Sequence, residues 1–492
     1  MKRVLFILSM VTFLITTLAL EVDYHFESSK LVLDVTPPGS WVLDVDGTSV
    51  SFEKTAIVPW KKGRVDWVIV RSSKGNETKR VLIVGVHDEA PKIALNFPDL
   101  LGLGVYNISL KIVDDWDDTS DIRLTIKVDG KELQGKALDT FFLKDGLHTL
   151  RITATDTYGN SRSVEKTFRV SIAFPPVPEY QLKGPDSILF KNPTNVLMLY
   201  PEDVGKLKEV VALSREKGRI MRPIDEAGNL GSAFVVPPAP SNLTAVSKKI
   251  PLTSLKSNYL LLKSGSPYPV IGKVVLPENL SLVLGSGAEI NLTTAQLIVK
   301  GVFMNLPEGA TINGGTIMIT GGARVYFENL TITSNLIIGG GKVLYLKKIK
   351  GTEDINIDGV KWAVIEDMKL SSLSCTSCYG VYLKRCSIGK LQIENVREVV
   401  VENSKIDEFG VSDFTKAYLI TSTASKLTIS TLSKVISLNS TINSVYLMSA
   451  STLRIRGGKL GDAKLESYSL LQLFEAEKTG KVELRHSVLE ER

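Results

Sequence analysis

Side chains able to act as bases or metal ligands are scarce along most of this chain. The 492 residues include only four histidines, His25, His87, His148 and His486, so none falls between residues 149 and 485. Histidine exchanges a proton near neutral pH more readily than other side chains and is the commonest metal ligand. Histidine-based catalysis and histidine metal sites are therefore excluded from the largest part of the protein. We expect His148 to be a structural strand residue.

The three cysteines lie close together in the sequence, at Cys375, Cys378 and Cys386. A structural zinc site would need a fourth ligand, and no histidine is near. In an exported protein, one disulfide and one free thiol are expected from three cysteines, and the spacing leaves the pairing open. Cys386 also occupies an inward position of the repeat described below, which suits a small buried side chain.

Acidic residues gather in one loop around Trp116 and in adjacent pairs further along the chain. The loop carboxylates could offer hard oxygen ligands to Ca²⁺, but the glycine and distal glutamate of an EF-hand are absent, so we expect a solvated loop. The pairs Glu366–Asp367 and Asp407–Glu408 contain the groups that a glycosidase uses as acid and base. Neighbouring strand positions face opposite sides of a sheet, so we do not expect either pair to cooperate. The loop aspartates are Asp114, Asp115, Asp117, Asp118 and Asp121.

The first residues of the chain carry a targeting pattern. Lys2 and Arg3 precede an apolar run from Val4 to Leu20, and Thr17-Leu18-Ala19 offers small residues at a cleavage spacing. This order is typical of a secretory signal peptide, here over residues 1–19. An apolar run of about 17 residues is also at the lower limit for crossing a bilayer, so an uncleaved membrane anchor is the alternative. We therefore expect a secreted, periplasmic or cell-surface protein.

Residues 20–90 contain short alternating segments separated by turn residues. Segments 31–35 and 65–70 alternate apolar and polar side chains, and turn residues stand between them. Short strands at this spacing predict a small β-sandwich. The run Val35-Thr36-Pro37-Pro38-Gly39-Ser40-Trp41, followed by Val45-Asp46-Gly47, resembles the opening of the PEGA family of bacterial surface modules.

Residues 91–173 predict a second β-sandwich with a different signature. Asp129-Gly130 is a hairpin turn, and Leu150, Ile152 and Ala154 alternate along one strand, facing inward. The pattern L-x-D-G-x-H-x-L, followed by A-x-D-x-x-G-N, is similar to bacterial immunoglobulin-like modules of surface proteins. That resemblance implies a fold and almost nothing about chemistry.

Residues 174–250 have the composition of a connecting segment. Proline-rich runs at 174–178 and 236–240 mark stiff connectors. Between them, Pro201 and two acidic residues open a stretch with apolar residues at helical spacing. We therefore predict one short helix over residues 201–217.

From residue 325 onward one pattern recurs: apolar, any, apolar, polar, polar. Nine copies follow one another at nearly equal intervals. Apolar alternations at a fixed period predict a β-solenoid whose coils each hold about 18 residues. A left-handed hexapeptide coil needs an apolar residue at every sixth position, and that period fails here, so a right-handed parallel β-helix is favoured. The copies begin at Val325, Leu344, Ala363, Val381, Val399, Tyr418, Ile436, Leu453 and Leu471.

The segment that leads into the repeat has a related pattern. Residues 268–280, 285–290 and 297–301 resemble the first coils of the right-handed β-helix repeat superfamily of secreted bacterial proteins. The resemblance covers residues 265–485. The predicted chain is all-β and consists of two small β-sandwiches, the connecting segment, a right-handed parallel β-helix over residues 251–485 and a charged tail over residues 486–492.

Charged residues at the end of each copy predict the register of the stack. In a parallel stack the same position of successive copies forms a column, and alternating signs avoid contacts between like charges. Each exposed pair contributes about 0–1 kcal/mol. We interpret the columns as devices that fix the register. They are Glu328, Lys347, Glu366, Lys384 and Glu402 at the fourth position, and Lys348, Asp367 and Arg385 at the fifth.

The second position should face outward, yet it is apolar or aromatic in six successive copies. Such a stripe would cover a few hundred Å², which indicates a partner surface. The alternative is packing against the chain's own helix or connecting segment, and the sequence does not separate the two. The candidate binding stripe comprises Tyr326, Tyr345, Val364, Tyr382, Val400 and Leu419.

These features favour a structural or binding protein over an enzyme. The Asn-Thr-Asp, Asp-Asp, Gly-His-Gly and Arg-Ile-Lys set shared by polygalacturonase-type hydrolases does not appear in order. A net charge of +6 is small for this length and argues against a nucleic-acid partner. We predict no catalytic residue, cofactor or metal, and expect the β-helix to present its surface to a glycan, an envelope protein or a second copy. The alternative is a divergent polysaccharide lyase or glycoside hydrolase.

Overall fold

The computed structural model describes residues 20–27, 30–60, 64–74, 76–84, 89–114, 117–157, 159–183, 187–190, 196–200, 206–207 and 218–492. Over these residues the structure is all-β, as predicted, and its described helical elements are the short 3-10 helices η1 (Thr140–Phe142) and η3 (Lys263–Gly265). The chain divides into two compact units, residues 1–171 and 172–492. The predicted signal peptide, residues 1–19, lies outside the described residues.

The first unit begins with two antiparallel sheets that share one hydrophobic core. A three-stranded sheet in the order β1-β2-β5 and a four-stranded sheet in the order β4-β3-β6-β7 both contribute to that core. Leu33 and Leu43, one from each sheet, are fully buried. Two sheets with alternating inward side chains form a sandwich-like module. Its strands are β1 (Glu21–Glu27), β2 (Lys30–Thr36), β3 (Trp41–Val45), β4 (Thr48–Phe52), β5 (Thr55–Pro59), β6 (Val65–Ser72) and β7 (Thr78–Val84).

A second group of antiparallel strands completes the first unit around a five-stranded sheet in the order β13-β12-β15-β16-β9. Leu150, Ile152 and Ala154 are fully buried, as the alternation predicted. His148 is a buried strand residue whose Nδ1 lies 2.6 Å from Oδ2 of Asp129. The strands are β8 (Lys92–Asn96), β9 (Leu100–Leu101), β10 (Val105–Asn107), β11 (Ser109–Val113), β12 (Arg123–Val128), β13 (Lys131–Glu132), β14 (Ala137–Asp139), β15 (Gly146–Thr155) and β16 (Ser161–Val170).

Short antiparallel strands open the second unit, in the segment predicted to be a connector. β17 (Tyr180–Lys183) pairs with β18 (Ser187–Phe190). A four-stranded sheet, here called the cover sheet, follows in the order β20-β19-β21-β22. The predicted helix over residues 201–217 falls outside the described residues except for Lys206 and Leu207, which form a strand. The cover sheet consists of β19 (Val196–Tyr200), β20 (Lys206–Leu207), β21 (Arg219–Pro223) and β22 (Phe234–Val236).

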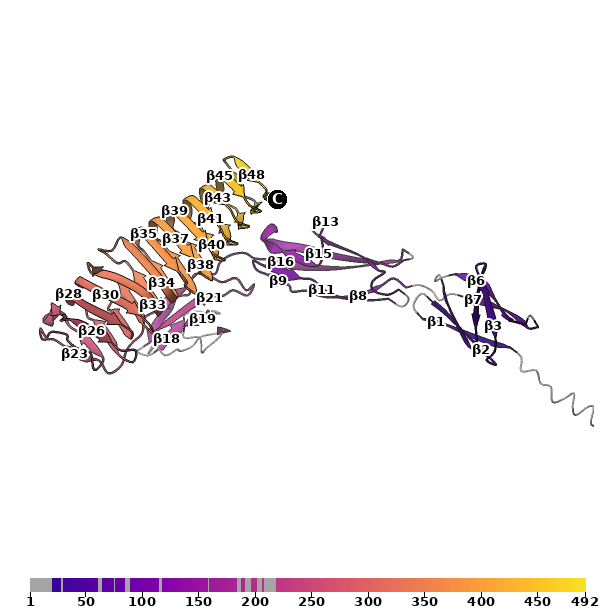
Figure 1. Cartoon of the computed structure of the whole chain (residues 1–492), viewed down its shortest axis with the longest axis horizontal. Helices are drawn as coiled ribbons and strands as arrows, with labels where there is room; N and C mark the ends of the chain where they lie inside the picture. Colours follow the sequence, from indigo (N-terminus) through magenta and orange to yellow (C-terminus); the bar gives the residue numbers. More distant parts are fainter. Residues whose placement is uncertain are drawn as a thin grey trace, which may run out of the picture. The chain divides into compact units, whose positions relative to one another are not determined.

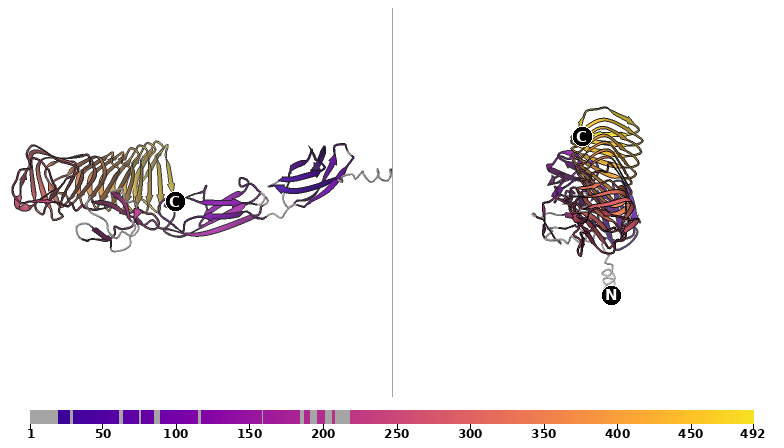
Figure 2. Two further views of the ribbon diagram at one scale, coloured as in Figure 1. Left: turned by 90° about the horizontal axis from the view of Figure 1, so that it is seen from below. Right: turned by 90° about the vertical axis from the view of Figure 1, so that its left-hand side faces the viewer.

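The rest of the second unit is one parallel β-solenoid, in which 27 strands from β23 to β49 join a continuous sheet. Successive coils lie side by side as rungs from β23 toward β48 (Figure 1), and the C-terminus leaves the last coil (Figure 2). Every described strand pair of this sheet is parallel.

The solenoid strands have the following bounds: β23 (Thr244–Val246), β24 (Tyr259–Leu261), β25 (Tyr268–Pro269), β26 (Lys273–Leu276), β27 (Ser281–Leu284), β28 (Glu289–Val299), β29 (Val302–Asn305), β30 (Ala310–Thr320), β31 (Arg324–Glu328), β32 (Leu330–Ile332), β33 (Asn335–Lys347), β34 (Asp354–Glu366), β35 (Lys369–Thr376), β36 (Gly380–Lys384), β37 (Ser387–Glu394), β38 (Glu398–Glu402), β39 (Lys405–Ser412), β40 (Lys416–Ile420), β41 (Thr423–Ile429), β42 (Lys434–Leu438), β43 (Thr441–Leu447), β44 (Thr452–Arg456), β45 (Lys459–Glu466), β46 (Leu470–Phe474), β47 (Glu477–Lys478), β48 (Val482–Arg485) and β49 (Val488–Glu491).

The register of the repeat is more regular than the sequence pattern indicated. Val399 pairs with Ala417, and Ala417 pairs with Val435. The copies predicted to begin at Tyr418 and Ile436 therefore begin one residue earlier. From the third copy onward all coils then have the same length. Alanine at 417 hid the start of its copy, because a small side chain gives a weak apolar signal.

The solenoid is longer than predicted at both ends. Its first strand, β23, begins at Thr244 and not at residue 251. Its last strand, β49, pairs with β46 and places Leu489 beside Leu471, which is a further copy of the repeat. The residues expected to form a charged tail are thus mostly part of the final coil.

Hydroxyl side chains hold the two stacked corners where coils bend. At one corner, the backbone N–H of Ser404 donates to Oγ of Ser422 (3.0 Å) and that of Ser422 donates to Oγ of Ser440 (3.1 Å). At the other, the N–H of Thr415 donates to Oγ of Ser433 (3.2 Å). Buried backbone donors at bends need such partners, so these serine and threonine columns make the corners rigid.

Candidate functional site

The apolar stripe predicted at the second repeat position is buried beneath the cover sheet. Tyr326, Tyr345, Val364, Tyr382 and Val400 form one column through the strand register. They pack in one hydrophobic cluster with Leu199, Ile220 and Val235 of the cover sheet and with Ala233, which directly precedes β22. Each of the five column residues is 5% exposed or less.

The sixth residue predicted for the stripe is misplaced by the register error described above. Val400 pairs with Tyr418, so Tyr418 continues the column, whereas Leu419 points into the solenoid core. The column also extends in the other direction to Met304 and Val283. The sequence left two explanations open for this stripe. Because the column residues are buried, the stripe packs against the chain's own connecting segment.

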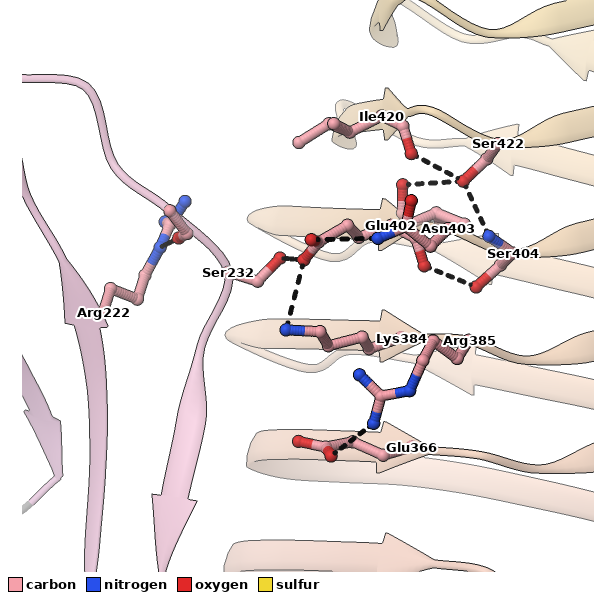
Figure 3. A network of polar contacts seen from close by, with 12 residues as sticks. Arg222, Ser232, Glu366, Lys384, Arg385, Glu402, Asn403, Ser404, Ile420 and Ser422 are labelled. Atoms are coloured by element: carbon pink, nitrogen blue, oxygen red, sulfur yellow. Dashed lines mark hydrogen bonds and ion pairs between the residues drawn. The ribbon is translucent and has the colours of Figure 1, made fainter. Parts of the chain in front are cut away.

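Charged and polar groups fasten the cover sheet to the solenoid. Arg222 of β21 is buried, and its Nη1 donates to Oε2 of Glu398 in β38 (2.8 Å). The hydroxyl of Tyr382 donates to the same Oε2 (3.1 Å), and the Arg222 guanidinium lies 5.3 Å from the Tyr382 ring centre. Ser232 donates to Glu402, which also approaches Lys384 at 3.8 Å (Figure 3). The cover sheet is therefore bound through both apolar and ionic contacts.

Beside this attachment, one corner of the solenoid forms a wide-open groove of about 670 Å³ that is lined mainly by residues with charged or hydroxyl side chains, here called the corner groove. One edge is the stack of bend residues Asp367, Arg385, Asn403 and Thr421, whose φ angles lie between 47° and 54°. The other edge follows the first residues of the next strands. The groove is lined by Asp367, Met368, Lys369, Arg385, Cys386, Ser387, Asn403, Ser404, Lys405, Thr421 and Thr423.

Within the corner groove, Arg385 holds two carboxylates with different properties. Its Nε and Nη2 donate to Asp367 at 2.6 and 3.0 Å, and these bonds lower the pKa of Asp367. Its Nη2 also donates to Glu366 (3.3 Å), whose burial raises its pKa. Asp367 reaches the guanidinium because it stands at the bend and not within a strand. The two carboxylates therefore do not point to opposite sides, as neighbouring strand positions would, and both accept hydrogen bonds from Arg385.

The corner groove also contains two lysines, Lys369 and Lys405, that differ from Arg385 in having no carboxylate partner among the described residues. Lys369 pairs in register with Ser387, and Ser387 pairs with Lys405, so the two lysines share one column and are two coils apart. Both are exposed. Neither has an ion-pair partner among the residues that the structure describes. The column thus offers two free cations about 10 Å apart.

The three cysteines are buried free thiols, so the structure does not contain the disulfide expected from the sequence. Cys375 lies in the inward column between Ile357 and Ile393. Burial raises the pKa of all three thiols, to about 11 for Cys378 and for Cys386. A thiol with a raised pKa forms little of the reactive thiolate, which suits packing residues.

The acidic loop of the first unit contains a hydrogen-bonded aspartate. The carboxylate of Asp117 accepts bonds from the backbone N–H of Thr157 (2.8 Å) and from its hydroxyl (2.9 Å). Asp115 lies outside the described residues. Within the described ranges, no group of three or more histidine, cysteine, aspartate or glutamate residues could hold a metal ion. Nor do those ranges include a helix with the length and hydropathy needed to cross a bilayer.

Sequence reasoning missed the corner groove, although its signal was present. Lys369, Ser387, Lys405 and Thr423 recur at the interval of one coil, as do Ser404, Ser422 and Ser440. The repeat was defined by its apolar positions, so polar residues of equal period were not assigned to a common surface.

No protein-family model matches the sequence, and neither does any curated protein. Among solved structures, the FN1–FN3 domains of chicken CNTN1 are 6% identical with a TM-score of 0.22, covering 44% of this chain and 96% of that one. A structure that addresses host cell surface retention of a 1.5-MDa bacterial ice-binding adhesin is 11% identical with a TM-score of 0.19, covering 44% of this chain and 96% of that one.

A third similar structure is SGBP-B of the Bacteroides ovatus mixed-linkage glucan utilization locus, in complex with a mixed-linkage heptasaccharide. It is 17% identical with a TM-score of 0.14, covering 35% of this chain and 52% of that one. All three TM-scores are too low to indicate a shared function.

Proposed function

We propose that this protein is a secreted or cell-surface binding protein whose solenoid binds an anionic glycan in the corner groove. The observation that carries the proposal is the pair of exposed, unpaired lysines, Lys369 and Lys405, in one column of a rigid corner. Two cations about 10 Å apart suit an extended polymer that carries repeated carboxylate or sulfate groups. Each charge would be met by a point cation on the solenoid.

Both edges of the groove supply neutral hydrogen-bonding groups. The side chains of Asn403 and Thr421 stand at exposed bends, and Ser387 and Thr423 lie in the lysine column. Amides and hydroxyls both donate and accept, as sugar hydroxyls do. The buried serine column behind the bend fixes these groups before binding, which reduces the entropy lost when a ligand is ordered.

The remaining parts of the chain fit a surface role as proposals from the sequence. The leader at residues 1–19 would direct export. The two sandwich-like modules would then act as spacers or docking units for the solenoid.

The proposal is tested by electrophoresis of the full chain through gels containing polygalacturonate, heparin, hyaluronate or neutral dextran. At least one anionic polymer should retard the protein, and dextran should not. Lys369→Ser with Lys405→Ser should abolish most of that retardation, because it removes both free cations. Lys273→Ser with Lys300→Ser removes two exposed lysines outside the groove and should have no such effect.

Retardation that is equal in the two double variants would contradict the proposal. So would release of reducing ends or unsaturated products from the retarding polymer, because that result would support the enzyme alternative.

A further inference from the structure

A row of exposed apolar side chains runs along the second corner of the solenoid. Phe414, Leu432 and Tyr468 are 70%, 56% and 81% exposed, and the small Ala450, which is also exposed, completes the row. These four residues, here called the aromatic ridge, follow one another at the interval of one coil. The N–H of Phe414 donates to Thr431 O, that of Leu432 to Ser449 O and that of Ala450 to Ser467 O, at 2.8–3.0 Å. The ridge therefore ascends the solenoid one coil at a time.

The residues of the aromatic ridge occupy backbone positions that disfavour them. The φ angles of Phe414, Leu432 and Tyr468 are 60°, 58° and 64°. Bulky side chains are uncommon in this left-handed region, where glycine and asparagine are at ease. The same three side chains also expose most of their apolar surface to water. Positive φ angles and exposed apolar surface are both unfavourable for these residues. Their occurrence at the same three positions indicates that the exposed side chains serve in binding.

The aromatic ridge stands on a rigid support. The residue that follows each ridge member is a buried hydroxyl: Thr415, Ser433, Ser451 and Ser469. The N–H of Thr415 donates to Oγ of Ser433, and the hydroxyl of Ser451 donates to the carbonyl of Ile429 (3.0 Å). Because these bonds fix the bends, the rings are presented in one arrangement before any ligand binds.

The dimensions of the aromatic ridge select the kind of ligand. It is one residue wide and spans three coil intervals, about 14 Å. Its exposed side chains offer roughly 400 Å² of surface, about half of what each partner buries in a standard protein–protein interface. A thin extended polymer can cover such a ridge, whereas a protein partner would leave most of its own surface unused.

We infer that the aromatic ridge is a second binding site, for an extended neutral glycan with β-linked pyranose rings. Pyranoses with equatorial hydroxyls present flat C–H faces, which would pack on the rings of Phe414 and Tyr468. Their edge hydroxyls would meet the exposed Ser449 and Ser467, which directly precede ridge residues. Leu432 and Ala450 leave room for the sugars between the two rings. This inference rests on different residues from the corner groove and does not depend on it.

The test is calorimetric titration of the full chain with cellohexaose and with xylohexaose. At least one should bind, and Phe414→Asn with Tyr468→Asn should weaken that binding about tenfold or more. Asparagine accepts a positive φ, so this variant should keep or raise the thermal midpoint, which separates lost binding from lost folding. Phe414→Tyr with Tyr468→Phe should bind like the wild type, because both rings remain. The groove variant Lys369→Ser with Lys405→Ser should also bind like the wild type.

Equal affinities in the wild type and the asparagine variant would overturn the inference, as would no binding of either hexasaccharide. A wild-type dimer in sedimentation that dissociates in the asparagine variant would also overturn it, in favour of a second copy as the occupant.

Discussion

At the residue scale, Arg385 joins two carboxylates whose surroundings shift their pKa values in opposite directions. Hydrogen bonds from Arg385 lower the pKa of Asp367, whereas burial raises that of Glu366. The sequence predicted the charge columns to which these residues belong. The pairs Lys347–Glu328 (2.7 Å) and Arg385–Asp367 (2.6 Å) confirm them. It could not show that Asp367 turns toward Arg385, because that depends on the bend.

Replacing this cation should make stability depend differently on pH. Asp367, whose folded pKa is lowered, stabilises the fold above its unfolded value of 3.8, and this contribution is lost as pH falls through the lowered pKa. Glu366, whose folded pKa is raised, opposes folding as pH rises above that pKa, and Arg385 limits the effect. Arg385→Gln should therefore be destabilised at pH 7, by an amount that shrinks as pH falls below 4. Urea unfolding at pH 7, 5 and 3 measures this, with Lys390→Gln as the control. A difference that stays constant with pH would show that the carboxylates do not depend on Arg385.

A single glycine makes room for a tryptophan in the next coil. A Cβ built on Gly380 would lie 2.5 Å from the ring of Trp362, its neighbour in register. Gly380→Ala should lower the free energy of unfolding by about 1–3 kcal/mol, since a packed core has no space for the methyl group. At Gly410 the nearest atoms belong to the end of the Gln392 side chain, which can move aside. Gly410→Ala should cost much less, and equal losses in urea unfolding would refute the packing argument.

At the element scale, the cover sheet shows how tertiary structure changes the meaning of a sequence pattern. The apolar column was visible in the sequence, yet its partner was not, because β19, β21 and β22 hold only three to five residues each. Such short strands lack the periodicity that identifies longer ones. These strands lie over the apolar column because packing there removes the apolar side chains of the column from water.

The ionic attachment of the cover sheet should be essential to its docking. Glu398→Ala would leave the guanidinium of Arg222 buried without its carboxylate, at a cost of about 3–5 kcal/mol. Proteolysis should then cut preferentially between residues 172 and 243, as mapped by mass spectrometry. Arg222→Met with Glu398→Met removes both charges and should recover most of the stability. If the single and double variants are cleaved equally fast, the charge pair does not hold the sheet.

At the scale of the whole second unit, the solenoid is a rigid support on which surface columns are displayed. The sequence predicted its period because apolar positions must recur to fill a continuous core. It did not predict the two proposed sites, because these lie at the bends, where φ is positive and the residues do not follow the alternation of the strands. The corner groove and the aromatic ridge both stand at such bends, each backed by a hydroxyl column.

The most direct test of anionic-glycan binding is calorimetric titration of the full chain with an oligogalacturonate or a heparin oligosaccharide, at low and at moderate salt. The wild type should bind, and more weakly at moderate salt, because exposed charges are screened. Lys369→Ser with Lys405→Ser should lower the affinity about tenfold or more and flatten the salt dependence. Affinity and salt dependence that match the wild type in this variant would contradict the assignment of the corner groove as the binding site.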